Sequence, residues 1–404
     1  MRFPKFSGEW EICKVSELLD FYSTNSLSWE QLEYGEKAMM NLHYGLIHVG
    51  LPTMVDLRRD KLPNVKEGNM PKNFELCKEG DVAFADASED TNEVAKVIEL
   101  FNLDNKDIVC GLHTIHGRDN KNKTIVGFKG YAFSSSAFHN QIRRIAQGTK
   151  IYSISTKNFS ECYVGIPSKA EQTKIATLLR LIDERIATQN KIIEKLQSLI
   201  KGLNDNIHKG IKGETVCFSD LGEAYSGLSG KGGDDFGYGE PFITYMNVYQ
   251  NTYISEKDYE LVQIAPNEKQ NSVQYGDALF TLSSETPEEV GIGAVYLGNT
   301  QKLYLNSFCF GIHFYDERVL PQYLAHFISS SSFRRAIYPL AQGSTRFNLQ
   351  KNDFMKMKFL LPSLEKQGHI ANTLDALHCR LANEKSLTEQ YILLKKYLLS
   401  LMLI

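Results

Sequence analysis

The most constraining feature of the chain is a long amphipathic pattern that begins just after Pro167 and continues to His208. Its apolar residues recur at steps of four and three, which is typical of a helix that buries one stripe against another helix. Ser168 and Glu171 form a capping-box pattern, so the helix is expected to begin beside them. The apolar stripe consists of Ile175, Leu179, Ile182, Ile186, Ile193, Leu196, Ile200, Leu203 and Ile207.

The C-terminal stretch supplies a partner, because it repeats the first copy without a gap. Pro167 recurs as Pro362, 195 positions later (362 − 167 = 195), and the polar stripe residue Gln189 recurs as Glu384. A buried polar residue at one seam position is a known device for setting coiled-coil register. The same separation relates Ala146-Gln147-Gly148 to Ala341-Gln342-Gly343, Phe159 to Phe354, and Gln172 to Gln367; the second stripe is Ile370, Leu374, Leu377, Leu381, Tyr391, Leu394, Leu398 and Leu401.

The two helices separate two globular segments whose elements follow a similar order. The runs at 78–84 and 274–280 each place a Gly-Asp turn before an apolar strand. Strands and helices do not alternate regularly, so we expect an α+β fold with mixed or antiparallel sheets and an internal pseudo-twofold repeat. The two long helices are expected to pair as an antiparallel coiled coil. The expected divisions are two globular domains, at 1–166 and 213–361, and two long helical segments, at 167–212 and 362–404.

Several shorter elements are also predicted. The run at 44–49 reads as a strand, with 242–248 in the matching place, and 94–102 and 107–115 alternate as two strands that could pair. Helices are expected at 138–145 and 321–338.

Composition limits the class of protein. At 404 residues, with 42% hydrophobic and 23% charged residues, the chain resembles an ordinary globular protein with room for two or three domains. No apolar run reaches membrane-span length and the N-terminus lacks a signal-peptide pattern, so a cytoplasmic location without a membrane is expected. The seven cysteines include no C-x-x-C pair, which favours free thiols over disulfides or a zinc site.

A search for catalytic and cofactor motifs yields none, so no catalytic residue, metal ligand or cofactor is predicted on this chain. The glycine-rich run at 226–239 lacks the spacing of a phosphate-binding loop and is interpreted as flexible loop. His113 and His116 lie on an extended segment with no nearby third ligand, so a structural role is favoured over a metal. The carboxylates of Glu285, Glu288 and Glu289 lie in a polar loop.

The doubled motif resembles the specificity subunit of type I restriction–modification systems, over the whole chain. The element Pro-x-x-x-Glu-Gln-x-x-Ile-Ala begins at Pro167, and its echo at Pro362 departs from it only at Lys366. The Gly-Asp turns, the run at 110–115 and the run at 305–312 also look like the family.

The resemblance implies a subunit that catalyses nothing itself. It implies two target recognition domains, each reading one half of a bipartite site in double-stranded DNA, with the helices setting the spacer between the halves. It further implies docking of two methyltransferase (modification) subunits, which bind S-adenosylmethionine, and the addition of restriction (nuclease and translocase) subunits. One chain with two half-site readers follows the logic of dimeric DNA-binding proteins.

DNA-contact candidates are basic, amide, hydroxyl and aromatic residues on expected loops and strand ends, because such side chains contact phosphates and base edges. Ser344, Thr345 and Arg346 follow Gly343, where a backbone turn is suited to cradling a phosphate. The full set is Arg58, Arg59, Lys61, Lys121, Lys123, Arg143, Arg144, Lys150, Lys231, Tyr245, Asn247, Arg334, Arg335, Ser344, Thr345, Arg346 and Asn348.

The net charge of −3 differs from the basic character usual in a DNA-binding domain. Binding needs only a local basic face, and partner subunits would supply further phosphate contacts. This interpretation predicts weak DNA binding by the isolated chain and much tighter binding by a complex. Two alternatives stay open: a coiled-coil protein–protein scaffold without DNA specificity, and an enzyme with an unrecognised site.

Overall fold

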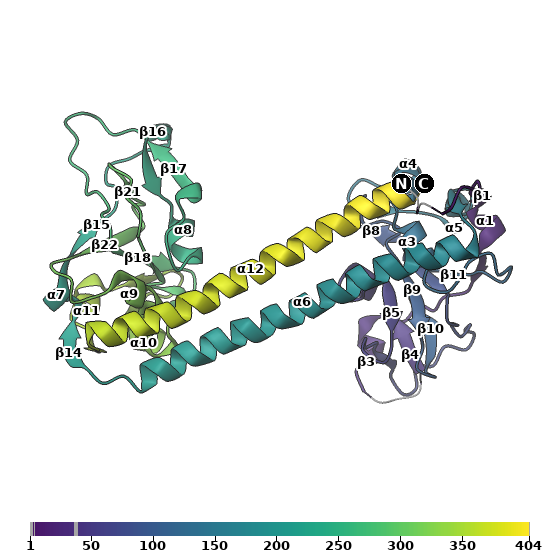
Figure 1. Ribbon diagram of the computed structural model, residues 1–404, viewed down its shortest axis with the longest axis horizontal. Coiled ribbons are helices and arrows are strands. Elements are labelled where there is room, and N and C mark those ends of the chain that lie inside the picture. Colours follow the sequence, from purple (N-terminus) through teal and green to yellow (C-terminus); the bar gives the residue numbers. More distant parts are fainter. Residues whose placement is uncertain (1–2, 4, 36–38, 404) are drawn as a thin grey trace. The chain divides into compact units, whose positions relative to one another are not determined.

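The computed structural model describes residue 3, residues 5–35 and residues 39–403. Its contacts divide the chain into two units, residues 1–190 with 386–404, and residues 191–385. Each unit holds one globular domain together with part of helix α6 (Lys169–Lys209) and part of helix α12 (Leu364–Met402), which Figure 1 shows in teal and yellow. The predicted domains instead end where each long helical segment begins, at 167 and 362, and these bounds stay predictions.

The two long helices pack against each other inside both units. In unit 1 the beginning of α6, through Leu179, shares a core with the end of α12, through Met402. In unit 2 the end of α6, through Ile207, packs with the beginning of α12, through Ile370 and Leu374. The helices therefore run antiparallel, and the predicted α+β fold with two long paired helices is confirmed.

One part of the predicted stripe on α12 is wrong. Leu394 is 43% exposed, whereas the neighbouring Lys395 turns toward α6. Its ammonium lies 2.6 Å from the carboxylate of Asp183, and it also lies over the ring of Tyr131. An ion pair thus occupies a position where periodicity suggested a leucine, because the aliphatic stem of lysine can pack while its charge finds a carboxylate.

The repeated glutamine holds the start of each long helix in the same way. Gln172 is fully buried, donates to the carbonyls of Pro167 and Lys123, and accepts the backbone N–H of Ile125. A buried amide that satisfies three backbone groups fixes the helix start against the domain.

In the second copy Gln367 is also fully buried. It donates to the carbonyls of Pro362 and Arg318 and accepts the N–H of Leu320. The sequence repeat therefore encodes a repeated hydrogen-bond network, with one copy in each unit.

Unit 1 contains two sheets and two short strand pairs. The strand orders are β10-β4-β6-β3, β2-β11-β7-β9-β5, β12-β8 and β1-β13. Most pairs are antiparallel, while β10 with β4 and β5 with β9 are parallel. The strands are β1 (Glu11–Lys14), β2 (Asp20–Tyr22), β3 (Leu32–Glu33), β4 (Met39–Leu42), β5 (Met54–Asp56), β6 (Asn64–Val65), β7 (Val82–Ala85), β8 (Ala87–Ser88), β9 (Val97–Asn102), β10 (Asp107–Cys110), β11 (Thr114–Arg118), β12 (Tyr152–Ser153) and β13 (Tyr163–Ile166), and the short helices are α1 (Val15–Leu18), α2 (Tyr44–His48), α3 (Lys129–Phe133), α4 (Ser136–Ile145) and α5 (Thr156–Ser160).

Unit 2 repeats this plan with one strand fewer in each of the two larger sheets and one strand more in the sheet that contains the hairpin. Its strand orders are β15-β22-β18-β20, β17-β16-β21, β19-β24-β23 and β14-β25. The antiparallel pair β14-β25 precedes α12, as β1-β13 precedes α6. The strands are β14 (Glu214–Cys217), β15 (Gly222–Ser226), β16 (Phe236–Ile243), β17 (Tyr259–Val262), β18 (Ala278–Thr281), β19 (Ser283–Ser284), β20 (Gly293–Val295), β21 (Tyr304–Leu305), β22 (Cys309–Phe314), β23 (Ala341–Gln342), β24 (Phe347–Leu349) and β25 (Lys358–Leu361), and the short helices are α7 (Phe218–Leu221), α8 (Tyr245–Gln250), α9 (Pro321–Ile328), α10 (Ser331–Ile337) and α11 (Lys351–Met355).

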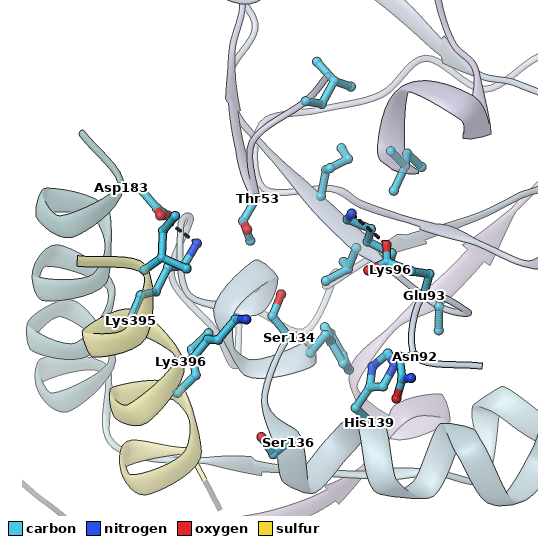
Figure 2. Close-up of a pocket in the computed structure, with 18 of the residues that line it drawn as sticks. Thr53, Asn92, Glu93, Lys96, Ser134, Ser136, His139, Asp183, Lys395 and Lys396 are labelled. Atoms are coloured by element: carbon cyan, nitrogen blue, oxygen red, sulfur yellow. Dashed lines mark ion pairs between the residues drawn. The ribbon is translucent and has the colours of Figure 1, made fainter. Parts of the chain in front are cut away.

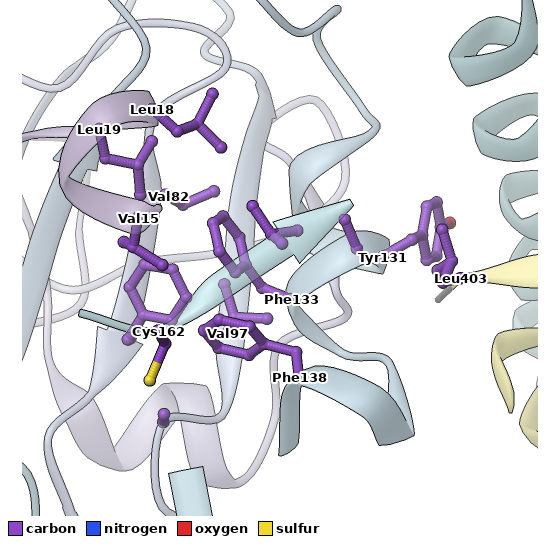
Figure 3. Packing of buried hydrophobic residues seen from close by; sticks show 14 of the residues in the cluster. Val15, Leu18, Leu19, Val82, Val97, Tyr131, Phe133, Phe138, Cys162 and Leu403 are labelled. Atoms are coloured by element: carbon purple, nitrogen blue, oxygen red, sulfur yellow. The ribbon is translucent and has the colours of Figure 1, made fainter. Parts of the chain in front are cut away.

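Each unit has its own aromatic core. Phe159 and its repeat Phe354 are both fully buried. Phe159 lies with its ring centre 4.6 Å from that of Phe84, and Figure 3 shows Phe133 and Phe138 in the same cluster. Burial of such rings supplies a large share of a domain's hydrophobic stabilisation.

Three predicted elements are wrong. The run at 44–49 is helix α2, because the ring of His43 accepts the N–H of Gly45 and caps it. The matching run at 242–248 splits between strand β16 and helix α8. The strands at 94–102 and 107–115 do not pair with each other, since β9 joins β7 and β5 while β10 joins β4.

The helix expected at 321–338 is two helices, α9 and α10, interrupted after Ile328, where Ser330 caps α10 through its hydroxyl. The helix at 138–145 is confirmed as α4. Among the described residues, no helix combines the length and the apolar character that crossing a membrane requires.

Candidate nucleic-acid interface

A hairpin with an exposed tip occurs in both units, at the repeated Ala-Gln-Gly. Residues 147–153 form hairpin 1, closed by hydrogen bonds between the backbones of Gln147 and Ser153. Residues 342–348 form hairpin 2, where Gln342 pairs with Asn348. Hairpin 1 adds its strand β12 to β8, and hairpin 2 adds β24 to β19.

The repeated glycine makes this hairpin possible. Gly148 has φ of +137° and Gly343 has φ of +146°, which is the region that favours glycine. A Cβ at Gly148 would overlap the carbonyl oxygen of Ile151, and one at Gly343 would overlap that of Arg346. The two tips, residues 149–151 and 344–346, are consequently exposed in a tight turn.

In unit 2 the tip of hairpin 2 lies over an aromatic surface. The guanidinium of Arg346 is 5.7 Å from the ring centre of Phe308, which is 55% exposed. On α8 the rings of Tyr245 and Tyr249 stack with centres 6.0 Å apart, and the Tyr245 hydroxyl donates to the carbonyl of Ser283 in β19. An arginine above exposed rings can contact a phosphate or a base edge.

In unit 1 the residues that correspond to this aromatic surface and hairpin tip line an open pocket of about 660 Å³. His113, the counterpart of Phe308, packs edge-on against Tyr44 of α2 with ring centres 5.3 Å apart. His48 bonds through Nε2 to the carbonyl of Ala87 at the base of β8. The tip residue Ile151 lines the same pocket and is 62% exposed.

Acidic side chains lie beside both aromatic surfaces. Glu89, Asp90 and Glu93 line the pocket in unit 1. In unit 2 a hydrogen bond with Tyr249 holds the pKa of Glu289 below its usual value. Carboxylates cannot bind phosphates, but they accept hydrogen bonds from the amino groups of cytosine and adenine. Each surface thus combines a basic or apolar tip, rings and hydrogen-bond acceptors.

Many of the predicted contact residues in unit 1 are held by the protein itself. Arg58 forms a paired contact with Asp56, at 2.5 and 2.9 Å, and this hydrogen bonding lowers the pKa of the Asp56 carboxyl. Arg59 donates to the Met54 carbonyl. Others with internal partners are Lys121, on the Glu17 carbonyl at 2.8 Å, Lys123, on Glu11 at 2.5 Å, and Arg143, on Asn92 and Asn140.

Two predicted residues in unit 2 also serve the fold. Lys231 is held 2.5 Å from Glu268 with its side chain only 8% exposed. Asn247, in the first turn of α8, is buried and donates to the carbonyl of Ser255, which lies beyond that helix. Both side chains are therefore held by contacts inside unit 2.

Arg334 is an internal clamp. Its guanidinium donates to the carbonyls of Glu288, Val290 and Gly291, at 2.6–2.7 Å, and burial lowers its pKa. The adjacent Arg335 is exposed. The arginine pair predicted as one site therefore divides into a structural and a solvent-facing residue.

The remaining predicted residues are exposed, and their side chains make no hydrogen bond or ion pair with other described residues. Within this group, Arg346 lies over the ring of Phe308, Lys150 is next to the pocket residue Ile151 at the tip of hairpin 1, and Asn348 is at the foot of hairpin 2. The group is Lys61, Arg144, Lys150, Arg335, Ser344, Thr345, Arg346 and Asn348.

A second pocket in unit 1, of about 670 Å³, lies between the domain and the end of α12. Figure 2 shows that its cations are largely paired, Lys395 with Asp183 and Lys96 with Glu93. Burial lowers the pKa of His139 on its wall. Arg143 on the same rim is held by Asn92 and Asn140, so the pocket is a poor match for a DNA backbone.

The repeated Gly-Asp turns are buried supports beneath these surfaces. Asp277 accepts hydrogen bonds from the Tyr225 hydroxyl at 2.7 Å and from His313 Nδ1 at 2.8 Å. Asp81 accepts from His116 at 2.7 Å and from Arg118. Asp277 thus holds β22, the strand that follows Phe308. Asp81 likewise holds β11, the strand that follows His113.

Sequence reasoning missed His48, His113, Ile151 and Phe308 as surface residues. A signal existed for two of them, because Phe308 stands 195 positions after His113, in step with the repeat. The turn conformation of His113, with φ of +56°, was not visible in the sequence.

Two domains with matching hairpins, each packed on part of an antiparallel helix pair, define a duplicated α+β protein. The family model described as "Type I restriction modification DNA specificity domain" matches residues 60–198 and 213–390. The chain belongs to this family, and the resemblance found in its motifs is confirmed.

Individual relatives agree with this membership. The chain is 25% identical over 279 residues to the specificity subunit of the type I restriction enzyme EcoKI from Escherichia coli K12, which covers 62% of this chain and 58% of that protein. The chain thus spans less than two thirds of the length of this curated relative.

Solved structures show the same fold. The S subunit of a type I restriction–modification system from M. genitalium superposes with a TM-score of 0.56 at 13% identity, covering 99% of this chain and 98% of that one. A chain from a study of complex assembly and conformational transition of the type I system gives a TM-score of 0.61 at 14% identity, with 98% and 97% coverage.

Proposed function

We propose that this chain is the DNA-specificity subunit of a type I restriction–modification complex, and that each unit reads one half of a bipartite site in double-stranded DNA. The observation that carries the proposal is the doubled surface of hairpin tip, aromatic rings and acceptors. Lys150 and Arg346 are suited to phosphate or guanine contacts, and the neighbouring carboxylates to amino groups of bases.

The paired helices are proposed to set the spacing of the half-sites and to dock two methyltransferase subunits. Large apolar side chains stay exposed on the unit 1 parts of these helices, namely Leu181, Leu393 and Tyr397, at 53%, 63% and 57%. Such exposure on a helix is typical of a protein-binding surface. S-adenosylmethionine and the methyl-transfer chemistry are assigned to those partners, as is DNA cleavage to restriction subunits.

The test is selection of bound duplexes from a random-sequence pool by the chain co-purified with its methyltransferase. We expect enrichment of a split motif with a fixed gap, and weak binding by the chain alone. Replacement of residues 213–361 by the equivalent domain of a relative should then change one half of the motif and leave the other intact.

The alternative function is a scaffold that joins proteins through the helices without reading DNA. Formation of the complex without enrichment of any motif would favour the scaffold and exclude the proposed reading of DNA. Tight, specific binding by the isolated chain at physiological salt would instead contradict the dependence on partner contacts.

A further inference from the structure

Two cysteines and a histidine that lie far apart in sequence meet inside unit 1. Cys77 precedes the Gly-Asp turn, Cys110 ends β10 and His116 lies in β11. One ligand atom from each lies within 4.8 Å of the others, and the two sulfur atoms are 3.6 Å apart. The three residues are 5%, 2% and 1% exposed.

The histidine is already oriented in the manner of a metal ligand. Its Nε2 is 2.7 Å from a carboxylate oxygen of Asp81, and Asp81 is itself held by Arg118. The other ring nitrogen, Nδ1, is buried and has no hydrogen-bond partner among the described residues. Metal-bound histidines commonly use one nitrogen for the metal and the other for a carboxylate.

The dimensions fit a tetrahedral zinc ion. With Zn–S bonds of about 2.3 Å and Zn–N bonds of about 2.0–2.1 Å, two sulfurs lie about 3.8 Å apart and a sulfur and a nitrogen about 3.6 Å apart. The observed sulfur separation of 3.6 Å is close to the first distance. Sulfur and imidazole ligands favour zinc over magnesium or calcium.

We propose that Cys77, Cys110 and His116 bind one zinc ion, with both sulfurs as thiolates and Nδ1 of His116 as the third protein ligand. Two thiol protons pass to solvent when the ion binds, and a water molecule takes the fourth position. The charges balance, because Zn²⁺ offsets the two thiolates while Arg118 already offsets Asp81.

The site joins parts of unit 1 that are otherwise in different sheets. Cys110 belongs to the sheet of β10 and β4, whereas His116 belongs to the sheet of β11 and β7. The backbone N–H of Cys77 donates to the carbonyl of Ile108 in β10. A bound ion would therefore fasten the turn between β10 and β11, which carries His113.

In unit 2 the Gly-Asp turn is joined to the neighbouring strands by hydrogen bonds and a tyrosine ring, and not by cysteines. There Asp277 is bonded by Tyr225 and His313, and the ring of Tyr225 packs at Gly311 in the adjacent strand. The proposal thus predicts one zinc ion per chain, and not one per domain.

The test uses the full chain, produced without a histidine tag in zinc-supplemented medium, and measures metal content by mass spectrometry after gel filtration. We expect about one zinc per chain, and, after exchange with Co²⁺ alone, the sulfur-to-cobalt charge-transfer absorption of thiolate ligation. Cys110→Ser and His116→Gln should each lose most of the zinc.

The matched control is Cys309→Ser, since Cys309 is equally buried but belongs to unit 2 and to no such cluster. This variant should keep its zinc. The proposal is overturned if the native chain carries far less than one zinc and shows no cobalt–thiolate absorption, if Cys309→Ser loses zinc equally, or if Cys77 and Cys110 are found as a disulfide. The cobalt measurement on the native chain decides the question even where a variant does not fold.

Discussion

At the scale of single residues, neighbours in the chain have different roles. The guanidinium of Arg334 donates hydrogen bonds to three backbone carbonyls of unit 2, while Arg335 on the same helix is exposed. Both follow the same sequence signal, a basic pair on a helix. Only the packing of α10 decides which one is an internal support.

Substitution of Arg334 by alanine should therefore destabilise unit 2. Three carbonyls lose a charged donor, and each unsatisfied buried group costs about 1–3 kcal/mol. Arg335→Ala should change the free energy of unfolding by less than about 0.5 kcal/mol, as is usual for exposed sites. Urea unfolding of both variants measures this, and equal stabilities would contradict the clamp.

Arg346→Ala tests the tip of hairpin 2. We expect weaker binding of the cognate duplex by the complex, and a slope of log affinity against log salt that is reduced by about 0.9 if Arg346 contacts one phosphate. Exposed Lys209, at the end of α6, supplies the matched control for loss of one charge.

Lys209→Ala should leave both quantities unchanged. Should Arg346→Ala bind with unaltered affinity and salt dependence, hairpin 2 is no part of the interface. A relaxed preference at one position of the motif, with an unchanged salt slope, would indicate a base contact instead.

At the scale of elements, two glycines in the second half of the chain have opposite roles. Gly343 is required by the hairpin, since a Cβ there would overlap the Arg346 carbonyl, whereas Gly368 in α12 has open space around its Cβ position. Gly343→Ala should lower the melting temperature and weaken DNA binding.

Gly368→Ala should raise stability by about 1 kcal/mol, because alanine favours a helix over glycine by that amount. The pair is compared by thermal unfolding. A Gly343→Ala variant as stable as the native chain would show that the hairpin relaxes freely and does not need this backbone conformation.

A histidine cluster joins three helices in unit 2 and predicts an acid-sensitive junction. Burial lowers the pKa values of His208 on α6, His326 on α9 and His378 on α12, although Asp375 opposes the shift at His326. The rings of His326 and His378 stack with centres 5.4 Å apart.

The direction of the effect follows from proton binding. The unfolded chain takes up protons near pH 6.5 while the folded cluster resists them, so stability is complete above about pH 7 and is lost as the pH falls below about 6.5. The melting temperature should drop between pH 7.5 and 5.5, before carboxylates titrate.

His378→Gln should reduce that drop, whereas substitution of the exposed His369 by glutamine should not. A melting temperature that is flat from pH 7.5 to 5.5 would exclude the cluster as a source of acid sensitivity.

At the scale of the whole molecule, the proposed spacer function depends on helix length. Insertion of seven residues into both α6 and α12, at matching positions, preserves the seam and adds about 10.5 Å at 1.5 Å per residue. If the helices set the half-site separation, the gap in the selected motif should lengthen by about three base pairs.

Insertion in one helix alone breaks the register and should abolish complex formation or specific binding. Selection of bound duplexes measures both outcomes. An unchanged gap after the double insertion would show that the helices do not act as the spacer.

The sequence alone determined the repeat, the two long helices and the family. Gln172 and Gln367 are 195 positions apart because each joins its domain to a long helix through the same hydrogen bonds. Phe159 and Phe354 have the same spacing because each is buried in the core of its domain. Such regular patterns are local and periodic, so they can be read without a structure.

Tertiary structure alone decided which polar residues are free and which meet. Lys231 and Arg334 look like surface cations, yet folding pairs or buries them, and Lys395 replaces Leu394 on the seam. Cys77, from the segment before β7, meets Cys110 of β10 and His116 of β11. Contacts between residues distant in sequence depend on strand order and register, which propensity and spacing do not encode.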